Sequence, residues 1–485
     1  MHSSLSTIQF SMNPWHMGMS FESHAHLKEK LYESKIDSKY IFLGGLNQDL
    51  IRDNKQPIQL RALSKNYQNL KFMNELLSHN DFCDLVRQSR ANCKKLMHAF
   101  AQMEFFEILD LAYQSEGIDR ERALIAVEMA LLDKDKIWKI NSIDSYPNSI
   151  VFLKAYIRSY LSVRRILQDN KTTHVNLFNT RFLNERAARD AALELKCMIT
   201  EFDQVNSRGD SFGLFSESIH SPSERATLVK EFAQSPQSRE YLETEPPSQT
   251  WIKLRRDGAL QSFTRRQILG KLPEIPRGKK IVSCFLSSFD ELILAGYAKL
   301  DHKITQDNSL ETICSIIGRH KDWHLIVRSH PNMLTRPKRE QLYWREKLRN
   351  LDAQVIQPEE EFDSYALIES SDLVLTFGST TGVEAVALGK PSLLLGESLY
   401  SGLKICLRLD KVEEIEEFLG RPPTPSREQI EELNLYCKYQ LFGGTRFRYL
   451  YVLNYDTYEF NPNLYFRGKR FLQSTRGFWD KYKIL

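Results

Sequence analysis

The sequence lacks the features that mark several common classes of protein. Its 66 Lys and Arg residues nearly balance 62 Asp and Glu residues, so the total charge does not imply a nucleic-acid partner. The seven cysteines are odd in number and form no C-x-x-C pair, which favours a reducing compartment and argues against a structural zinc site. No apolar run approaches the ~18 residues that span a bilayer, and residues 1–18 do not resemble a signal peptide. We therefore expect a cytoplasmic protein.

Two nucleotide-binding signatures are also missing. The sequence contains no G-x-x-x-x-G-K-[ST] and no well-placed G-x-G-x-x-G, so neither a P-loop NTPase nor a dinucleotide dehydrogenase is indicated. The D-x-D string Asp133-Lys134-Asp135 lies in a charged helical stretch and is more typical of a solvated helix face than of a metal site. We expect no metal and no cofactor.

The chain has 485 residues, which favours two domains, and its pattern of apolar segments indicates the class of each. In the second half, strand-like and helical segments alternate, which predicts parallel βαβ units in a doubly wound sheet. The predicted strands there are 279–286, 323–329, 353–357, 372–377 and 391–395. In the first half we expect strands at 6–12, 39–45, 173–179 and 197–202. Residues 60–168 between them are mostly helical in pattern, so the fold class is α/β with a helical insertion in the N-terminal domain.

Polar segments containing proline suggest where the domains divide. Residues 235–250 and 272–280 are the best linker candidates, and we predict domains at 1–270 and 271–425. Residues 426–485 form a third segment rich in aromatic and basic residues. We favour packing of this segment back on the N-terminal domain. The alternative is contact with an anionic membrane surface, through Phe447, Arg448, Tyr449, Arg467, Lys469, Arg470 and Phe471.

Polar loops follow all five predicted strands of the second half. In an open parallel sheet, ligands bind outside the carboxyl ends of the strands. The loops are 287–291, 330–332, 358–365, 378–382 and 396–402, and each carries hydroxyls, acids or a histidine. Such residues are common in any loop, but their presence at five loops of one edge predicts a ligand crevice.

The residue types in this crevice indicate a phosphorylated ligand. The segment "GSTTG" at 378–382 precedes a helix, so its N–H groups and hydroxyls are suited to an anion; the alternative is an ordinary helix cap. His330, aimed by Pro331, is a phosphate donor when protonated, or else a surface turn residue. Glu384 is placed to accept bonds from ribose hydroxyls, or to interact favourably with the helix dipole.

These motifs carry a family likeness. The segments "SSFDE", "RSHPN", "DSYALIESSDLVLTFGSTTGVEAVALGKP" and "GESLY" together resemble bacterial capsule polysaccharide biosynthesis proteins, which look like glycosyltransferases of the GT-B type. The likeness is strongest over 279–402 and extends more thinly to "NPWHMGMSFE" and "FNTRFLNERAARDAALE". In the latter segment that family more often has Asn-Gly-Arg where this chain has Asn179-Thr180-Arg181.

The resemblance implies two Rossmann-like domains that face a central cleft, with the donor bound by the C-terminal domain and the acceptor by the N-terminal one. The co-substrate would be a nucleotide-sugar, and no metal would be needed because protein dipoles and cations stabilise the leaving diphosphate. The predicted donor-binding residues are Ser287, Ser288, Asp290, Glu291, His330, Pro331, Ser364, Tyr365, Ser379, Thr380, Thr381 and Glu384.

The acceptor side needs a base for the attacking hydroxyl. We nominate His16 and Glu22, because both follow the first strand, with Glu201 as the next catalytic candidate. Asn179 and Arg181, which follow a later strand, are the predicted acceptor-side residues. For each of these residues a capping or surface role is the alternative.

The expected function is transfer of a sugar from a nucleotide-sugar to a growing capsular or other surface polysaccharide, with a glycan or lipid-linked glycan as acceptor. Within catalysis, the alternatives are a transferase of polyol phosphate from a CDP-linked donor and an epimerase of a UDP-sugar. From another class, the alternative is a non-catalytic nucleotide-binding assembly protein. A peripheral position at the inner face of the cell membrane is compatible with the transferase.

Overall fold

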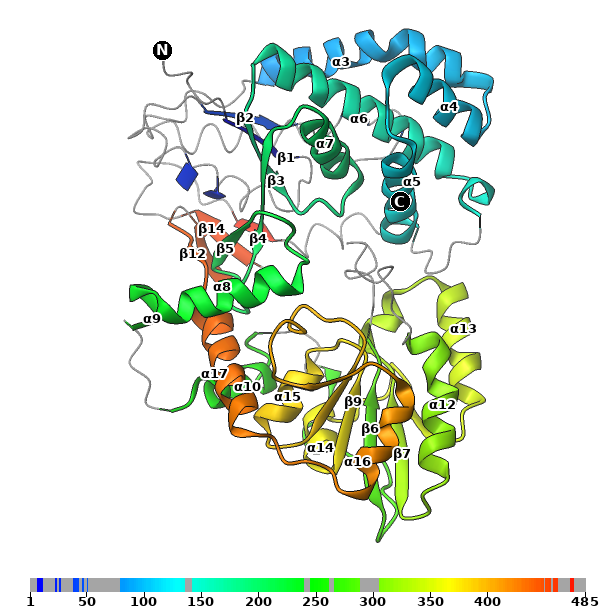
Figure 1. The fold of residues 1–485 in the computed structure, drawn as a ribbon, viewed down its shortest axis with the longest axis vertical. Helices are drawn as coiled ribbons and strands as arrows, with labels where there is room; N and C mark the ends of the chain where they lie inside the picture. Colours follow the sequence, from blue (N-terminus) through cyan, green and yellow to red (C-terminus); the bar gives the residue numbers. More distant parts are fainter. Residues whose placement is uncertain are drawn as a thin grey trace. The chain divides into compact units, whose positions relative to one another are not determined.

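The computed structural model describes most of the chain. The described residues are 7–11, 22–23, 26–27, 38–42, 46–47, 50, 79–135, 142–239, 245–260, 266–287, 305–448, 450–454, 457–460 and 472–474. The chain divides into two compact units (Figure 1). Unit 1 comprises residues 1–205, 209–219 and 445–485, and unit 2 comprises residues 206–208 and 220–444.

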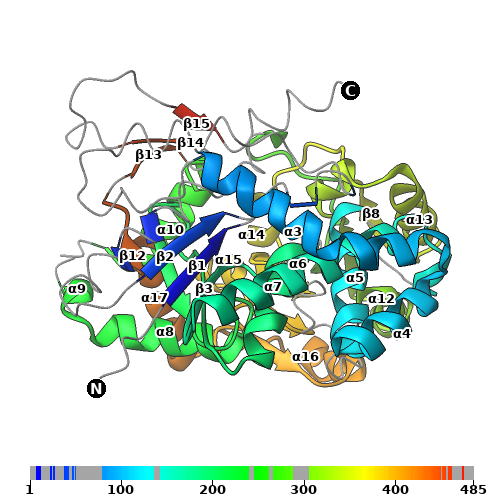
Figure 2. The same cartoon turned by 90° about the horizontal axis from the view of Figure 1, so that it is seen from above.

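Unit 1 is built on a six-stranded sheet with the order β12-β5-β4-β3-β1-β2. The pairs β1–β2, β1–β3 and β3–β4 are parallel, whereas β5 runs antiparallel to β4. Figure 2 shows β2, β1 and β3 side by side. The strands are β1 (Thr7–Ser11), β2 (Ser38–Phe42), β3 (His174–Phe178), β4 (Met198–Gln204), β5 (Ser211–Phe215) and β12 (Thr445–Arg446).

A helical segment separates β2 from β3 in the sequence, as the pattern of residues 60–168 predicts. Its helices are α3 (His79–Ala99), η3 (Phe100–Gln102), α4 (Phe105–Glu116), α5 (Arg120–Lys134), η4 (Ile143–Ser145) and α6 (Ser149–Asp169), and α7 (Leu183–Glu194) follows β3. Local signals set these ends: Asp119 caps α5 by accepting from the Arg122 N–H, and Gly117 ends α4 at a φ of 71°. Side chains of Ile8, Phe10, Val175 and Leu177 pack with this helical layer in one core.

Unit 2 is built on a second six-stranded sheet, with the order β11-β10-β9-β6-β7-β8 and parallel pairing throughout. Its strands are β6 (Lys280–Phe285), β7 (Trp323–Arg328), β8 (Gln354–Ile356), β9 (Leu373–Thr376), β10 (Ser392–Leu395) and β11 (Leu407–Leu409). The first five match the five predicted strands. β9 and β10 are buried along their whole length, as strands covered on both faces must be.

Helices cover both faces of this sheet (Figure 1). Alternate strand residues point to opposite sides, so Val282 packs with α12 and α13, while Ile281 packs with α14 and α15. The helices are α8 (Pro222–Gln234), α9 (Pro236–Arg239), α10 (Pro247–Arg256), α12 (Gln306–Gly318), η7 (Pro331–Thr335), α13 (Lys338–Arg349), α14 (Ser364–Glu369), α15 (Thr381–Ala387), η8 (Val412–Glu414), α16 (Ile415–Gly420) and α17 (Arg427–Phe442).

The fold class is therefore α/β with two Rossmann-like units and a helical segment inside the first, as predicted. The predicted domain boundary near residue 270 falls inside unit 2, because α8 and α10 pack against α17. Residues 235–250, a predicted linker, include α9 and the start of α10.

The aromatic and basic segment after residue 426 is split between the units. Helix α17 belongs to unit 2, whereas β12 pairs with β5 in unit 1. Phe447 stacks on Phe212, and Arg446 forms an ion pair with Asp210 at 3.1 Å. A three-stranded antiparallel sheet follows, made of β13 (Leu450–Asn454), β14 (Thr457–Phe460) and β15 (Leu472–Ser474). The membrane interpretation of this segment stays a prediction.

Candidate functional site

The strand order of unit 2 singles out one position at the carboxyl edge of its sheet. From β6 the chain moves outward through β7 and β8, and then returns to the other side of β6 for β9, β10 and β11. The loops after β6 and β9 therefore leave the sheet in opposite directions, and open α/β sheets bind ligands at such a switch point. The loop after β9 is 378–382, the "GSTTG" segment, and Ser287 follows β6.

The loop after β9 is held by bonds among its own groups. The Ser379 N–H donates to the Thr376 hydroxyl at 3.1 Å, and the Gly382 N–H donates to the Ser379 carbonyl at 3.1 Å. The hydroxyls of Ser379 and Thr381 lie 2.8 Å apart. Helix α15 has only seven residues, so its dipole is short, and a ligand here depends more on side-chain charges than the sequence suggests.

Gly382 is needed for the tight packing under this loop. A Cβ at this position would lie 2.7 Å from the Tyr400 hydroxyl, 2.8 Å from Thr376 Cγ2 and 3.1 Å from Cys406 Sγ. The Tyr400 hydroxyl in turn donates to the Ser379 carbonyl at 2.7 Å. The segment after β10 thus packs against the loop after β9, which fixes the position of the Ser379 and Thr381 hydroxyls.

Glu384, the predicted ribose ligand, is paired with a residue that sequence reasoning missed. Arg255, at the end of α10, donates from Nε to Glu384 Oε1 at 2.6 Å and from Nη2 to the Thr380 hydroxyl at 3.1 Å. Its guanidinium also lies over the Trp251 ring. Arg255 is 9% and Glu384 5% exposed. Burial alone would lower the pKa of Arg255, but the Glu384 carboxylate raises it, and the net shift is upward, so Arg255 stays charged at pH 7.

The His330 loop differs from the sequence-based expectation in its protonation. Burial lowers the pKa of His330 to about 4, and the positive charges of Arg328 and Arg336 act in the same direction. The imidazole is therefore neutral at pH 7, not protonated as expected. Because the Asn332 N–H donates to Nδ1 at 3.1 Å, the ring proton is on Nε2, which makes Nε2 a donor without a positive charge.

The positive charge in this loop comes instead from Arg328, the last residue of β7. Its guanidinium is buried and donates to the carbonyls of Glu360 and Phe362, at 3.3 and 3.2 Å. Burial lowers its pKa to about 10, so it stays charged at pH 7. Among the described residues its Nε has no hydrogen-bond partner. A buried positive charge thus lies next to Ser329 and His330.

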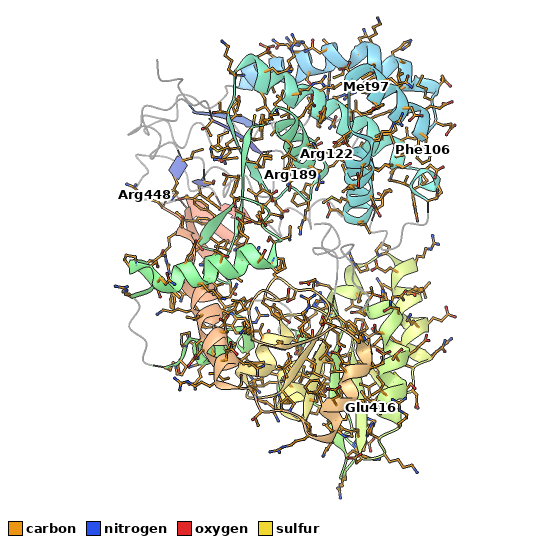
Figure 3. The ribbon with its side chains drawn as sticks, in the orientation of Figure 1. Met97, Phe106, Arg122, Arg189, Glu416 and Arg448 are labelled. Carbon is orange, nitrogen blue, oxygen red and sulfur yellow. The ribbon has the colours of Figure 1, made fainter. Side chains whose placement is uncertain are left out.

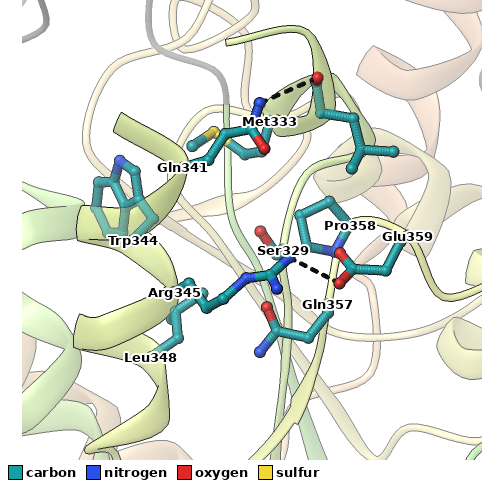
Figure 4. A pocket seen from close by; sticks show the side chains of 10 residues that line it. Ser329, Met333, Gln341, Trp344, Arg345, Leu348, Gln357, Pro358 and Glu359 are labelled. Carbon is teal, nitrogen blue, oxygen red and sulfur yellow. Dashed lines mark hydrogen bonds and ion pairs between the residues drawn. The ribbon is translucent and has the colours of Figure 1, made fainter. Parts of the chain in front are cut away.

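A pocket opens beside Ser329 at the carboxyl ends of β7 and β8 (Figure 4). Trp344 and Arg345 of α13 line one side, and Gln357, Pro358 and Glu359 line the other. Arg345 and Glu359 form an ion pair across it at 2.8 Å. The pocket borders the predicted crevice, and the predicted residues Ser329-His330-Pro331 approach it through Ser329 alone.

The predicted residues Ser364 and Tyr365 begin helix α14. The Ser364 N–H donates to Gln267 Oε1 at 2.9 Å, and Tyr365 is buried under Arg256. Asp363 caps the helix by accepting from the Tyr365 N–H. These contacts account for both residues structurally, and their role in donor binding stays a prediction.

The sheet of unit 1 has its own switch point, between β1 and β3. The loop after β3 begins with Asn179, which has a φ of 28° and donates from Nδ2 to Asp203 at 2.9 Å. The guanidinium of Arg181 lies over the Phe182 ring. A backbone in the left-handed region suits Asn or Gly, so the first residue of the motif keeps the loop conformation although the second is Thr180 instead of glycine.

Glu201 lies in β4 and binds to three surrounding segments. Its Oε1 accepts from the Thr180 hydroxyl at 2.6 Å and lies 3.3 Å from Arg189 Nε, and its Oε2 accepts from the Ile219 N–H at 3.4 Å. Figure 3 shows Arg189 in this unit. Burial raises the pKa of Glu201, although the Thr180 hydroxyl and Arg189 oppose the shift. These contacts favour a role in holding the loop after β3 in place.

Glu22 is also buried and partnered. It accepts from the backbone N–H of Arg448 and lies 3.1 Å from Nε2 of His26. It thereby connects the segment after β12 to the segment after β1. The predicted residues His16, Ser288, Asp290 and Glu291 lie outside the described residues.

The described residues contain no group of three or more His, Cys, Asp or Glu side chains placed to hold a metal ion. None of the described helices is both long and apolar enough to cross a membrane.

Sequence reasoning missed Arg255, because its partner Glu384 lies 129 positions away. The local signal for this residue is the spacing of Trp251 and Arg255, which puts both on one face of helix α10.

Comparisons with known proteins found likenesses to solved structures alone. No protein-family model matches the chain, and no curated protein sequence matches it significantly. The KpsC beta Kdo 2,4 transferase of Thermosulfurimonas dismutans is 16% identical with a TM-score of 0.35, over 62% of this chain and 84% of that one. UDP-GlcNAc 2-epimerase from Neisseria meningitidis, bound to UDP-GlcNAc, is 14% identical with a TM-score of 0.29, over 90% and 96%. At these values the similarity assigns neither activity nor substrate to this chain.

Proposed function

We propose that this protein is a metal-independent glycosyltransferase of the GT-B type. It moves a sugar from a nucleotide-sugar to a growing capsular or other surface polysaccharide. The observation that carries the proposal is the placement of the "GSTTG" loop at the switch point of a parallel sheet, with Thr380 bonded to the buried Arg255. The motif likeness to capsule biosynthesis proteins supports the same function.

In the proposed reaction the acceptor hydroxyl attacks the anomeric carbon of the donor sugar, and the bond from that carbon to the diphosphate oxygen breaks. Negative charge develops on the leaving nucleotide and must be stabilised. Arg328 and the neutral Nε2–H of His330 are suited to this, together with the hydroxyls of Ser379 and Thr381. The acceptor proton passes to a base.

The base is proposed among His16, Glu22 and Glu201. Glu201 has a raised pKa, which suits a base, but both of its oxygens already accept hydrogen bonds. Glu22 binds the Arg448 N–H. Of the three, His16 is thus the first residue to replace in a search for the base.

The test is a panel of UDP-, GDP-, CMP- and CDP-linked donors, incubated with the protein and a capsular glycan acceptor while nucleotide release is followed. Acceptor-dependent release of the nucleotide from a sugar donor supports transfer. Release of CMP from a CDP-polyol indicates polyol-phosphate transfer instead, and conversion of a UDP-sugar without acceptor indicates an epimerase.

A further comparison separates catalysis from a non-catalytic nucleotide-binding role. The His330→Ala protein should remain folded and lose release, whereas the control Arg256→Met changes an exposed ion pair and should keep it. If a nucleotide raises the melting temperature of the wild type but no donor is ever cleaved, the protein binds nucleotides without catalysing transfer, and the proposal is wrong.

A further inference from the structure

Helix α10 ends with two consecutive arginines that lie in different environments. Arg255 is buried and binds Glu384 Oε1 and the Thr380 hydroxyl. Arg256 pairs with Glu369 at 2.8 Å, and both of these side chains are about one-third exposed or more. The buried pair thus belongs to the "GSTTG" loop, while the exposed pair is a surface contact with α14.

The position of Glu384 creates an electrostatic problem for a phosphate ligand. This buried carboxylate lies in the first turn of α15, directly after the loop proposed to receive the diphosphate. A buried charge acts strongly on its neighbours because little solvent screens it, so Glu384 alone would repel an anion at the loop. The guanidinium of Arg255, 2.6 Å away, cancels this charge.

Arg255 also determines how the Thr380 hydroxyl can act. A hydroxyl has one hydrogen to donate and can accept through its lone pairs. The Thr380 oxygen accepts from Arg255 Nη2 at 3.1 Å, so its own hydrogen must point elsewhere. The same arginine therefore removes a repulsion and leaves a donor for an anion.

We propose that Arg255 is a positioning residue for the diphosphate of the donor: it neutralises Glu384 and orients Thr380, so that the loop 378–382 accepts the phosphates. The assignment rests on the proposed function and deepens it. If Arg255 has this role, its loss weakens the binding of the phosphates and leaves the binding of the nucleoside unchanged.

The experiment measures a phosphate increment, defined as the ratio of the nucleoside Kd to the nucleoside diphosphate Kd. Calorimetry with the full chain uses the nucleoside and diphosphate of whichever base stabilises the wild type. In Arg255→Met we expect the increment to fall by about tenfold or more, because Glu384 is then uncompensated. In the matched control Arg256→Met it should stay within about twofold.

Two further variants separate neutralisation from a general loss of structure. Glu384→Gln leaves the positive charge in place, so its phosphate increment should rise above that of the wild type even if nucleoside binding weakens. Arg255→Met combined with Glu384→Gln removes both charges and should regain most of the increment lost in Arg255→Met. The Glu384→Gln result stands even if Arg255→Met does not fold.

The contrary results are equally specific. An unchanged increment in Arg255→Met, or an increment in Glu384→Gln at or below that of the wild type, overturns the assignment. A double variant no better than Arg255→Met shows that neutralisation of Glu384 is not the role of Arg255, and also overturns it. If the wild type binds no nucleotide of any kind, the proposed function itself fails, and this assignment fails with it.

Discussion

The two units are each built on a six-stranded sheet, but the buried carboxylates Glu384 and Glu201, which lie beside the two switch-point loops, are held differently. In unit 2, Glu384 is matched by one buried arginine beside the switch-point loop. In unit 1, Glu201 is shared among a hydroxyl, a backbone N–H and Arg189, whose side chain is 25% exposed. A full charge balanced inside the protein suits a site that must receive another charge, whereas distributed bonds suit a loop that must be held in shape. Matched substitutions in the two units test this difference.

The largest effect is expected from Glu384→Ala in unit 2. Removing the carboxylate leaves the buried charge of Arg255 without a compensating anion, so the free energy of unfolding should fall by about 3–5 kcal/mol. Urea denaturation measures this. Glu369→Ala, which removes the exposed partner of Arg256, should cost less than about 1 kcal/mol. Equal losses in the free energy of unfolding would show that the buried ion pair contributes no more to stability than the exposed one.

The corresponding change in unit 1 is Glu201→Ala, and we expect a smaller loss of about 1–3 kcal/mol. Thr180 and the Ile219 N–H lose an acceptor, but the partly exposed Arg189 can turn toward water. The same denaturation experiment applies. A loss greater than that of Glu384→Ala would reverse the comparison.

Replacing Gly382 by alanine tests the packing beneath the unit 2 loop. The new methyl group would clash with Tyr400, Thr376 and Cys406, so we expect a loss of about 2 kcal/mol, seen as a lower melting temperature. Adding Tyr400→Phe removes the closest of these contacts, the hydroxyl, and should recover part of the loss. Because Tyr400→Phe alone also loses the bond to the Ser379 carbonyl, the cost of Gly382→Ala is compared with and without Tyr400→Phe. An equal cost in both backgrounds would mean that Thr376 and Cys406 cause most of the strain.

His330 of unit 2 and Glu201 of unit 1 should make opposite contributions to stability in mild acid. His330 has a lowered pKa of about 4, so the unfolded chain takes up its proton first, and its contribution to stability is lost as the pH falls from about 6.5 toward 4. At pH 5 the loss is at most about 2 kcal/mol, and His330→Asn should abolish it. Burial raises the pKa of Glu201, so protonation there favours the folded state, and the contribution of Glu201 to stability rises as the pH falls. Denaturation of His330→Asn, Glu201→Ala and the wild type at pH 7 and pH 5 tests the direction of both effects.

The smallest effects concern the backbone of Asn179. Asn179→Gly relieves the backbone strain at a φ of 28° but loses the bond to Asp203. The two effects oppose each other, so the free energy of unfolding should change by less than about 0.5 kcal/mol. Asn179→Ala loses the bond and keeps the strain, so it should cost about 1–2 kcal/mol. Melting temperatures of the two variants give the comparison. Equal costs would show that the left-handed conformation is not strained.

Local patterns predict most strands of both sheets. The segments 279–286, 323–329 and 372–377 are apolar runs bounded by turn residues, and they form β6, β7 and β9. The edge strands β2 and β8 are predicted, whereas β11 and β12, with three and two residues, are missed because they show no alternation. β5 is also missed, because Gly213 interrupts its apolar pattern; a Cβ added at this position would lie 2.4 Å from Val205 Cγ1.

For the candidate site, the sequence likewise predicts some parts and misses others. Parallel pairing places the predicted loops 330–332 and 378–382 at one edge of the sheet, and the alternation of strands and helices in the sequence predicts that pairing. Arg255 belongs to a helix far away in the sequence, in a stretch that the composition assigns to the first domain. No local pattern reports such a contact. Arg328 and Arg336 lie near His330 in the sequence, but the burial that chiefly lowers the pKa of His330 depends on the tertiary fold.

The pairing of β12 with β5 also has a consequence for synthesis of the chain. Residues 445–446 complete the edge of the unit 1 sheet, yet nearly all of unit 2 lies between them and β5 in the sequence. A growing chain therefore carries the backbone groups of β5 without this partner until the ribosome has passed residue 446. An unpaired strand edge invites pairing with other chains, so the order of translation creates an interval in which nascent unit 1 is exposed to aggregation and to chaperones.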